Sequence, residues 1–372
     1  MIELFVATPL GTESVTRGEL IRLGYKNLKV ENGRIFVSAE LEDIPKLNIN
    51  LRTPNRIFAI LDKFKAQTFD ELFDGVYSYS WHEILPKDAK ILVTGRTEKS
   101  KLFSIRSCQS ITKKAIVEKL KSKYNVNLLE ETGQLFKIEI AMINDWAYLL
   151  FDTTGDSLHK RGYRKLISKA PLKENIAATI IFLTRWQDDE EVFWDPFCGC
   201  GTIAIEAAMI ARNIAPGINR TFLAEKNGFI SQQEWKRSRL EAIERIDYQK
   251  KFEILSSDIE ESMIHIAKAN AKEIGVDKDI RFFRADARKI KKPSNKGIIV
   301  TNPPYGQRID DMDIFELYRD FGRCLKTFDN WRFFVLSAYS KIEKAFGRKA
   351  DKNRKIYNGK IKTYLYFYFT LK

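Results

Sequence analysis

The first half of the chain alternates short apolar runs with longer amphipathic stretches. Apolar residues at every second position indicate strands, whereas apolar residues three or four positions apart indicate helices. The expected strands and helices are residues 2–7, 57–64 and 90–95, and residues 12–23, 42–51 and 107–124, respectively. Two hairpins are also expected, one turning at Asn32-Gly33, a type I′ turn signal, and one near Asn144-Asp145. This mixture predicts one or two small α+β layers.

The second half changes to short apolar strands separated by helices. The expected strands are 191–194, 252–257, 280–284, 298–301, 332–336 and 363–371, and the expected helices are 175–186, 201–211, 260–274 and 314–327. This alternation predicts a mostly parallel sheet covered on both faces. Residues 212–250 are too long for a simple connector and are expected to form a partly helical insertion. Residues 153–169, which hold Gly155, Gly162 and a basic cluster, are expected to be a linker.

Length and composition restrict the class of protein. A chain of 372 residues exceeds the usual size of one hydrophobic core, so two or more domains are expected. Its 44% hydrophobic and 30% charged residues are ordinary for a globular protein, and no apolar run approaches the roughly 18 residues of a membrane span. The start at Met1-Ile2-Glu3-Leu4 has no basic region, so a secretory signal is not expected.

Cysteine and histidine content excludes two further classes. Four cysteines are too few for a disulfide scaffold, which favours reduced thiols and a cytoplasmic location. The three histidines are scattered, and Cys198-x-Cys200 has no second ligand pair nearby, so no metal site is expected.

A net charge of +14 indicates a polyanionic partner, although a solvated basic surface would give the same count. Three segments concentrate the charge: the helix at 107–124, the cluster at 160–165 and the tail at 348–362. Each segment alone fits a solvated charge run equally well. The residues predicted to contact the phosphates of a nucleic acid are Lys113, Lys114, Lys160, Arg161, Arg164, Lys352 and Arg354.

A glycine-rich loop joins the strand at 191–194 to the next helix. It reads Asp-Pro-Phe-Cys-Gly-Cys-Gly-Thr from Asp195 to Thr202. Glycines allow a tight turn and close approach of a ligand, and the helix N-terminus presents free N–H groups to a carboxylate or phosphate. The spacing of Gly199 and Gly201 also fits the looser dinucleotide pattern, and a plain tight turn remains open.

Acidic residues end the next two strands. Asp258 follows one strand and could accept hydrogen bonds from ribose hydroxyls, while Asp286 follows the next and could accept from an adenine amine. Each could instead be a helix N-cap. Their order after the glycine loop favours a nucleoside ligand.

The strand at 298–301 ends in Asn302-Pro303-Pro304-Tyr305-Gly306. An exocyclic base amine is a poor nucleophile because its lone pair is delocalised. The Asn302 side-chain oxygen and the Pro303 carbonyl can accept its two N–H bonds and localise that pair. Tyr305 can stack on the base, which must first leave its own stack. The bland alternative is a proline-stiffened strand exit.

Together these motifs resemble the class I methyltransferases that use S-adenosylmethionine (SAM) and act on base amines. Lys160-Arg161-Gly162-Tyr163-Arg164, Ala170-Pro171-Leu172-Lys173-Glu174-Asn175 and the helix start Ser-Cys-Gln-Ser-Ile-Thr-Lys-Lys-Ala at 107–115 resemble the THUMP-containing RNA guanine-N2 methyltransferases, closest to the bacterial 23S rRNA enzymes. The resemblance covers essentially the whole chain. Cys200 replaces the usual small residue between the loop glycines, a change we expect to be tolerated.

The resemblance implies an α/β fold in which a Rossmann-like methyltransferase sheet, mostly parallel with an antiparallel last strand, follows ferredoxin-like and THUMP domains. The implied divisions are residues 1–60 (ferredoxin-like), 61–155 (THUMP, RNA-binding), 156–170 (linker) and 171–372 (methyltransferase). It implies that SAM is held by Asp195, Phe197, Gly199, Gly201, Thr202, Asp258, Ile259, Asp286, Ala287 and Asn302. Catalysis would fall to Asn302, Pro303, Pro304 and Tyr305.

The predicted activity is therefore methyl transfer from SAM to N2 of a guanine in 23S rRNA. Transfer RNA is an alternative substrate, and adenine-N6 transfer is another because its Asn-Pro-Pro-Tyr motif is nearly identical. A non-catalytic RNA chaperone with a vestigial SAM fold is the alternative from a different class. A NAD dehydrogenase is disfavoured because no acid–base residue for hydride transfer is evident.

Overall fold

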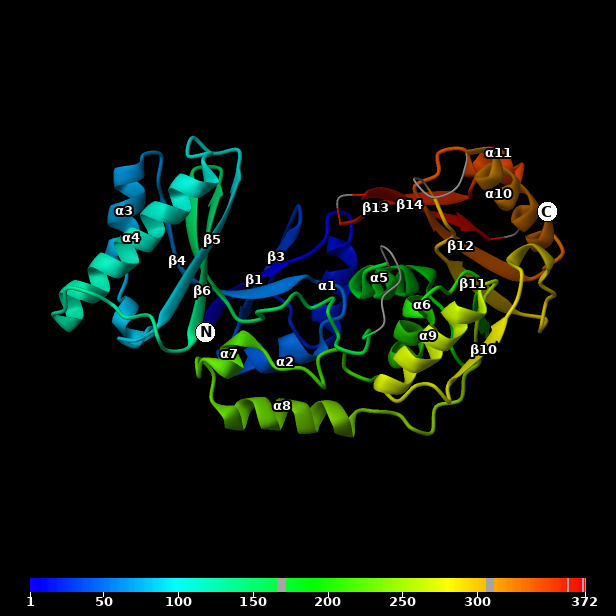
Figure 1. Ribbon diagram of the computed structural model, residues 1–372, viewed down its shortest axis with the longest axis horizontal. Coiled ribbons are helices and arrows are strands. Elements are labelled where there is room, and N and C mark those ends of the chain that lie inside the picture. Colours follow the sequence, from blue (N-terminus) through cyan, green and yellow to red (C-terminus); the bar gives the residue numbers. More distant parts are fainter. Residues whose placement is uncertain (166–171, 306–310, 360, 370, 372) are drawn as a thin grey trace.

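The computed structural model describes residues 1–165, 172–305, 311–359, 361–369 and 371. Two seven-stranded sheets lie side by side along the long axis of the molecule (Figure 1). The N-terminal sheet carries the α+β layers and the C-terminal sheet carries the α/β alternation, which confirms the expected fold class. The last five residues of the expected linker, 166–170, lie outside the described residues, as do Pro171 and Gly306.

The N-terminal sheet has the order β2-β3-β1-β4-β7-β6-β5. Its strands are β1 (Ile2–Ala7), β2 (Leu28–Glu31), β3 (Arg34–Ala39), β4 (Arg56–Lys65), β5 (Lys90–Glu98), β6 (Leu135–Ile143) and β7 (Trp146–Asp152). All neighbours are antiparallel except β5 and β6. Both expected hairpins form. Asn144 and Asp145 both adopt the positive φ angles of a type I′ turn, whereas at Asn32-Gly33 only Gly33 does, so the type I′ turn predicted there is wrong.

One long strand joins the two parts of this sheet. The first residues of β4 pair with β1, while nearly its whole length pairs with β7. Residue 60, the expected end of the ferredoxin-like lobe, therefore lies within β4, and the two lobes share a continuous sheet.

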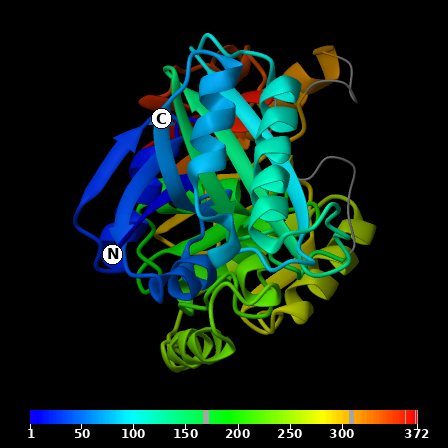
Figure 2. The same cartoon turned by 90° about the vertical axis from the view of Figure 1, so that its left-hand side faces the viewer.

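Four helices accompany this sheet: α1 (Glu13–Arg22), α2 (Asp43–Asn50), α3 (Phe69–Ser78) and α4 (Ile105–Tyr124). Helices α3 and α4 lie together on one face (Figure 2). Sequence analysis missed α3. Its signal was a capping box, in which the Thr68 hydroxyl accepts from the Glu71 N–H and the Glu71 carboxylate accepts from the Thr68 N–H.

The C-terminal sheet has the order β10-β9-β8-β11-β12-β14-β13. Its strands are β8 (Val192–Asp195), β9 (Ile254–Asp258), β10 (Ile280–Arg284), β11 (Gly297–Thr301), β12 (Trp331–Ser337), β13 (Lys352–Asn358) and β14 (Ile361–Tyr368). The first five are mutually parallel and β14 is antiparallel to β12, as expected. Residues 348–362 were expected to be a basic tail, but residues 352–358 form β13 at the edge of the sheet.

The helices that flank this sheet are α5 (Glu174–Thr184), α6 (Thr202–Ala211), α9 (Glu261–Glu273), α10 (Asp311–Leu325) and the short α11 (Ile342–Phe346). The β8–α6, β9–α9 and β11–α10 connections all leave the carboxyl ends of their strands, so they meet at one edge of the sheet. That edge brings together the glycine loop after β8 and Asn302, the first residue of the Asn-Pro-Pro-Tyr motif, after β11.

The insertion at 212–250 holds α7 (Leu223–Lys226) and α8 (Gln232–Glu244), as expected for a partly helical segment. Its helices pack on the N-terminal half, with α8 beneath α2 (Figure 1), while Ile214 and Ile246 near its two ends pack in the core of the C-terminal sheet. Phe229 stacks on Phe151 of β7 with ring centroids 4.1 Å apart, and Trp235 is fully buried in the N-terminal core. The insertion therefore fixes the two halves relative to each other.

Within the described part of the chain, no helix combines the length and apolar character that crossing a lipid bilayer requires.

Candidate active site

The glycine loop turns directly from β8 into α6. Gly199 and Gly201 have φ angles of +50° and +84°, which favour glycine. A Cβ on Gly201 would lie 2.9 Å from the Cβ of Ala267, so α9 packs too closely there for any side chain. A Cβ on Gly199 would meet no described atom within 4 Å. Gly201 thus serves helix packing, while Gly199 borders open space beyond β8.

Asp258, the last residue of β9, ties this loop to the neighbouring strand. Its Oδ2 accepts a hydrogen bond from the Gly199 N–H at 2.9 Å, and its Oδ1 accepts one from the Glu260 N–H at 3.1 Å. The next residue, Ile259, is 50% exposed and offers an apolar surface at this edge. The carboxylate and the isoleucine together could contact a ribose and a flat base.

Asp286 lies one strand further along. Its Oδ1 accepts from the Arg288 N–H at 3.0 Å and so caps a short 3-10 helix (Ala287–Lys289), the alternative that the sequence left open. The Arg288 guanidinium also donates to both of its oxygens and lowers the pKa of Asp286. Ala287 is buried beneath this turn. Asp286 therefore lies at the expected edge of the sheet, where the Arg288 guanidinium compensates its negative charge.

Asp195 and Asn302 end the adjacent strands β8 and β11. Burial raises the pKa of Asp195 to about 7, although the Thr301 hydroxyl donates to its Oδ1 at 2.6 Å. The Asp195 Oδ2 and the Asn302 Oδ1 are both buried and have no hydrogen-bond partner among the described residues. An unpaired buried polar atom costs about 1–3 kcal/mol. Two such acceptors beside an open glycine loop are suited to a ligand that carries hydrogen-bond donors.

The rest of the Asn-Pro-Pro-Tyr motif leaves the sheet edge. Pro303 is buried and Pro304 is exposed. Tyr305 is half-buried against the core that α10 and α11 form with one face of the sheet, and this burial raises its pKa. The Asn358 side chain, from the last residue of β13, opposes part of this rise in the pKa of Tyr305, so the two side chains lie close together. No sequence pattern predicted a role for Asn358, because Tyr305 lies far from it in the chain.

The remaining loop residues are packed rather than free. Phe197 is half-buried with its ring edge-on to Phe321 at 5.0 Å, and its N–H donates to Asp195. Thr202 begins α6 and its hydroxyl lies 3.3 Å from the buried Cys200 sulfur.

The predicted RNA-binding residues fall into two groups. Three are exposed to solvent: Lys114, above the Phe73 ring; Lys352, above the Phe367 ring; and Lys160, paired with Asp156. These side chains remain accessible to phosphates.

The other four are engaged within the protein. Lys113 pairs with Glu131, Arg164 binds Glu174 and the Leu172 carbonyl, and Arg354 donates to the Gly11 carbonyl and Ser14. The prediction for Arg161 needs correction. Its side chain is buried and pairs with Glu206, so it holds the two halves together instead of facing RNA.

Comparison with known sequences gives a family for each part. Residues 161–366 match the profile described as the RMKL-like methyltransferase domain, residues 3–58 match the RlmL ferredoxin-like domain and residues 66–152 match the THUMP domain. Bacillus subtilis YpsC, provisionally named an RNA methyltransferase, is 42% identical over 99% of this chain and 96% of its own length. The ribosomal RNA large subunit methyltransferase K/L of Buchnera aphidicola is 33% identical over 91% of this chain. The chain spans about half the length of that relative, because the alignment covers 50% of the relative's residues.

Solved structures agree with this placement. SMU.472, described as a methyltransferase complexed with SAH, superposes with a TM-score of 0.91 at 41% identity and covers 99% of this chain and 98% of its own. A Listeria monocytogenes protein named as an N6-adenine-specific DNA methylase superposes at 0.92 and 40% identity, covering 99% and 96%. SAM is the methyl donor that yields SAH, so the open glycine loop and the SAH-bound relative point to the same ligand. The chain belongs to the THUMP-containing, SAM-dependent RNA methyltransferase family whose catalytic part is the RMKL-like methyltransferase domain.

Proposed function

We propose that this protein methylates the exocyclic N2 amine of a guanine in large-subunit ribosomal RNA. The observation that carries the proposal is the Asn302 side-chain oxygen at the carboxyl end of β11, which is buried and has no hydrogen-bond partner among the residues that the structure describes. A base amine supplies the donor that this acceptor lacks. The same oxygen lies one strand away from the glycine loop, where the methyl donor is expected.

The choice of RNA rests on the N-terminal half and on the relatives. The THUMP match and the net charge of +14 favour an RNA partner, and the K/L relatives are named for large-subunit ribosomal RNA. The name of the Listeria relative favours adenine-N6 transfer as the second candidate, and transfer RNA is the second candidate substrate. Both alternatives keep the same methyl donor and the same catalytic loop.

We place SAM across the carboxyl ends of β8, β9 and β10. Gly199, Gly201 and the start of α6 would hold its methionine part, with Asp195, Phe197 and Thr202 lining the turn. Asp258 would bind the ribose, and Ile259, Asp286 and Ala287 the adenine. SAM supplies an activated methyl group on a sulfonium, so the protein need only position the acceptor in line with it.

The Asn-Pro-Pro-Tyr loop would position that acceptor. The target guanine must leave its stack to reach the sheet edge. The Asn302 Oδ1 and the Pro303 carbonyl would then accept the two N2 hydrogens and direct the lone pair at the methyl group, while the Tyr305 ring stacks on the base. No strong base is required, because the N2 proton becomes acidic as the methyl group arrives.

Asp258→Asn is expected to weaken SAM binding by about 10–100-fold, because hydrogen bonds to a charged acceptor contribute about 1.5–3 kcal/mol. The new amide would also face the Gly199 and Glu260 N–H donors and disturb the loop. Calorimetric titration with SAM measures the change. Asp277→Asn removes the same charge at the opposite edge of the sheet, before β10, and should leave the affinity unaltered. Equal affinities for the two variants would contradict the ribose assignment.

The proposed activity is tested by tritium transfer from labelled SAM to unmodified 23S rRNA and to bulk transfer RNA, followed by nucleoside analysis. N2-methylguanosine in 23S rRNA is the expected product. The same nucleoside in transfer RNA alone would overturn the substrate, and N6-methyladenosine would overturn the acceptor. Absence of label from both RNAs, despite SAM binding, would favour a non-catalytic role.

A further inference from the structure

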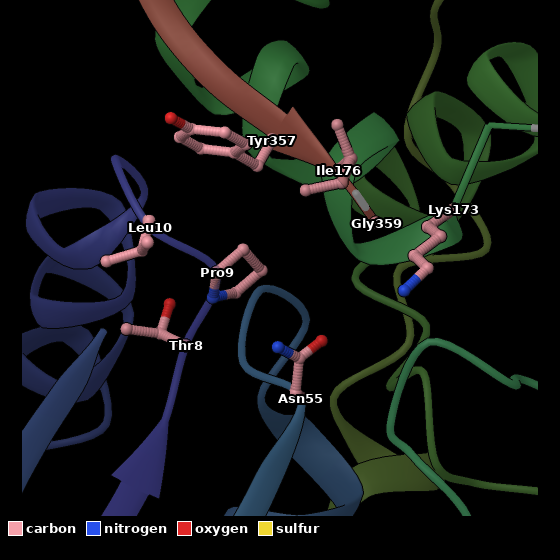
Figure 3. Close-up of a pocket in the computed structure, with 8 residues that line it drawn as sticks. All are labelled: Thr8, Pro9, Leu10, Asn55, Lys173, Ile176, Tyr357 and Gly359. Carbon is pink, nitrogen blue, oxygen red and sulfur yellow. The ribbon is translucent and has the colours of Figure 1, made fainter. Parts of the chain in front are cut away.

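A cavity of about 290 Å³ lies where the two halves of the chain meet (Figure 3). Its walls come from the loop after β1, the residue before β4, the start of α5 and the tip of the β13–β14 hairpin. In Figure 1 this hairpin extends over α5 toward the N-terminal sheet. The cavity therefore depends on both sheets, and the packed insertion and the Arg354 contact to Gly11 keep them in place.

One side of the cavity carries hydrogen-bond donors. The Lys173 side chain points into it (Figure 3). The nearby Lys160 and Lys165 pair with Asp156 and Glu273, whereas no described carboxylate pairs with Lys173. A lysine ammonium that lines a cavity without a counter-ion is suited to an anionic group.

Asn55 supplies a second, fixed donor on that side. Its Oδ1 accepts from the Asn175 side chain at 2.9 Å, its N–H donates to the Ala7 carbonyl at 2.7 Å, and its own carbonyl accepts from the Leu158 N–H at 2.8 Å. These contacts set the orientation of the side chain and leave its Nδ2 as the group available to a ligand. Its amide lies at the cavity wall in Figure 3.

The opposite side is apolar and aromatic. Pro9 and Leu10 come from the N-terminal half, and the ring of Tyr357 comes from β13 (Figure 3). A cation and an amide donor that face an aromatic ring across a small cavity match a nucleotide, with phosphate on one side and base on the other.

Asn358 links this cavity to the catalytic loop. It follows Tyr357, its Oδ1 accepts from the Lys173 N–H at 3.4 Å, and its side chain lies close enough to Tyr305 to affect the pKa of that residue. A guanine held by Asn302 and Tyr305 must remain covalently joined to its neighbours in the strand. One of these neighbours would enter the cavity, whose lining residues Lys173 and Tyr357 both adjoin Asn358.

We infer that this cavity binds a nucleotide that flanks the methylated guanine, with Lys173 and Asn55 holding its phosphate and Tyr357 contacting its base. The inference rests on the proposed function for the identity of the target. It adds a flanking subsite built jointly by the ferredoxin-like lobe and the methyltransferase sheet. The RNA around the target would have to be single-stranded there to enter.

The test measures RNA affinity over a range of KCl concentrations for Lys173→Gln, with a 23S rRNA transcript and with bulk transfer RNA. One lost phosphate contact should flatten the logarithmic salt dependence by about 0.7–0.9. Lys278→Gln is the matched control, because Lys278 is an exposed lysine at the opposite edge of the sheet. Tyr357→Ala should weaken binding about tenfold without altering that slope, since it removes stacking and no charge.

A Lys173→Gln slope equal to those of the wild type and Lys278→Gln, on both RNAs, would overturn the subsite. Unchanged affinity of Tyr357→Ala would remove the base contact. Binding does not require methyl transfer, so the measurement can be repeated in an Asn302→Ala background. Failure of the methylation assay with a flattened Lys173→Gln slope would sink the proposed activity and keep the subsite. N2-methylation together with unchanged slopes would support the proposed activity and overturn the subsite.

Discussion

Asn302→Ala is expected to lower kcat by about 10²–10³-fold, the usual cost of removing one group that acts mainly in the transition state. The variant loses the acceptor that localises the amine lone pair. Its SAM affinity should remain within a few-fold of the wild type. Single-turnover methyl transfer at saturating SAM and RNA measures the change.

Stability separates this effect from misfolding. The Asn302 Oδ1 is buried and accepts no hydrogen bond from the described part of the chain, so its removal should leave the melting temperature equal or higher. Asn302→Asp keeps an acceptor at the same place and is expected to retain more activity than alanine. A wild-type rate for Asn302→Ala with unaltered SAM affinity would show that another group activates the amine.

Arg161→Met is expected to destabilise the protein by about 3–5 kcal/mol, because it leaves a buried carboxylate without its partner. The Arg161 Nε donates to the Glu206 Oε1 at 3.2 Å, and both side chains are almost inaccessible to solvent. The guanidinium also donates to the Leu158 and Arg52 carbonyls at 2.6 and 2.5 Å. Urea unfolding measures the loss.

Two controls distinguish this structural role from the RNA contact that the sequence indicated. Lys160→Met changes the exposed neighbour and should shift stability by no more than about 0.5 kcal/mol. The double variant Arg161→Met with Glu206→Gln should recover part of the loss, since no unpaired charge remains. Normal stability of Arg161→Met, combined with a flatter salt dependence of RNA binding, would show that Arg161 contacts an RNA phosphate as the sequence predicted.

The sequence alone determined most of the order of elements, with α3 and β13 as exceptions, and it placed the candidate site residues at one edge of the sheet. The glycine loop, Asp258, Asp286 and Asn302 each follow a strand that pattern identifies. Parallel strands bring their carboxyl ends to one edge, so local spacing was enough to assemble these residues in advance. The two hairpins were equally local, because Asn32-Gly33 and Asn144-Asp145 each mark a turn between two adjacent strands.

The tertiary structure decided which charges face solvent. Arg161 lies in a basic cluster, yet it is buried because its partner, Glu206, is 45 residues further along. Arg354 likewise turns from a presumed RNA contact into a bridge to Gly11, 343 residues away. Charge runs do not reveal such partners, since burial of an ion is tolerable only where a distant opposite charge arrives.

Long-range pairing also decided the architecture between the lobes. The shared sheet depends on β4 pairing with β1 and β7, and the insertion packs on the lobe before it in sequence. The link from Lys173 through Asn358 to Tyr305 joins three segments that no periodicity relates. Local pattern fixes which residues form an element, but contacts between elements fix what each exposed or buried side chain can do.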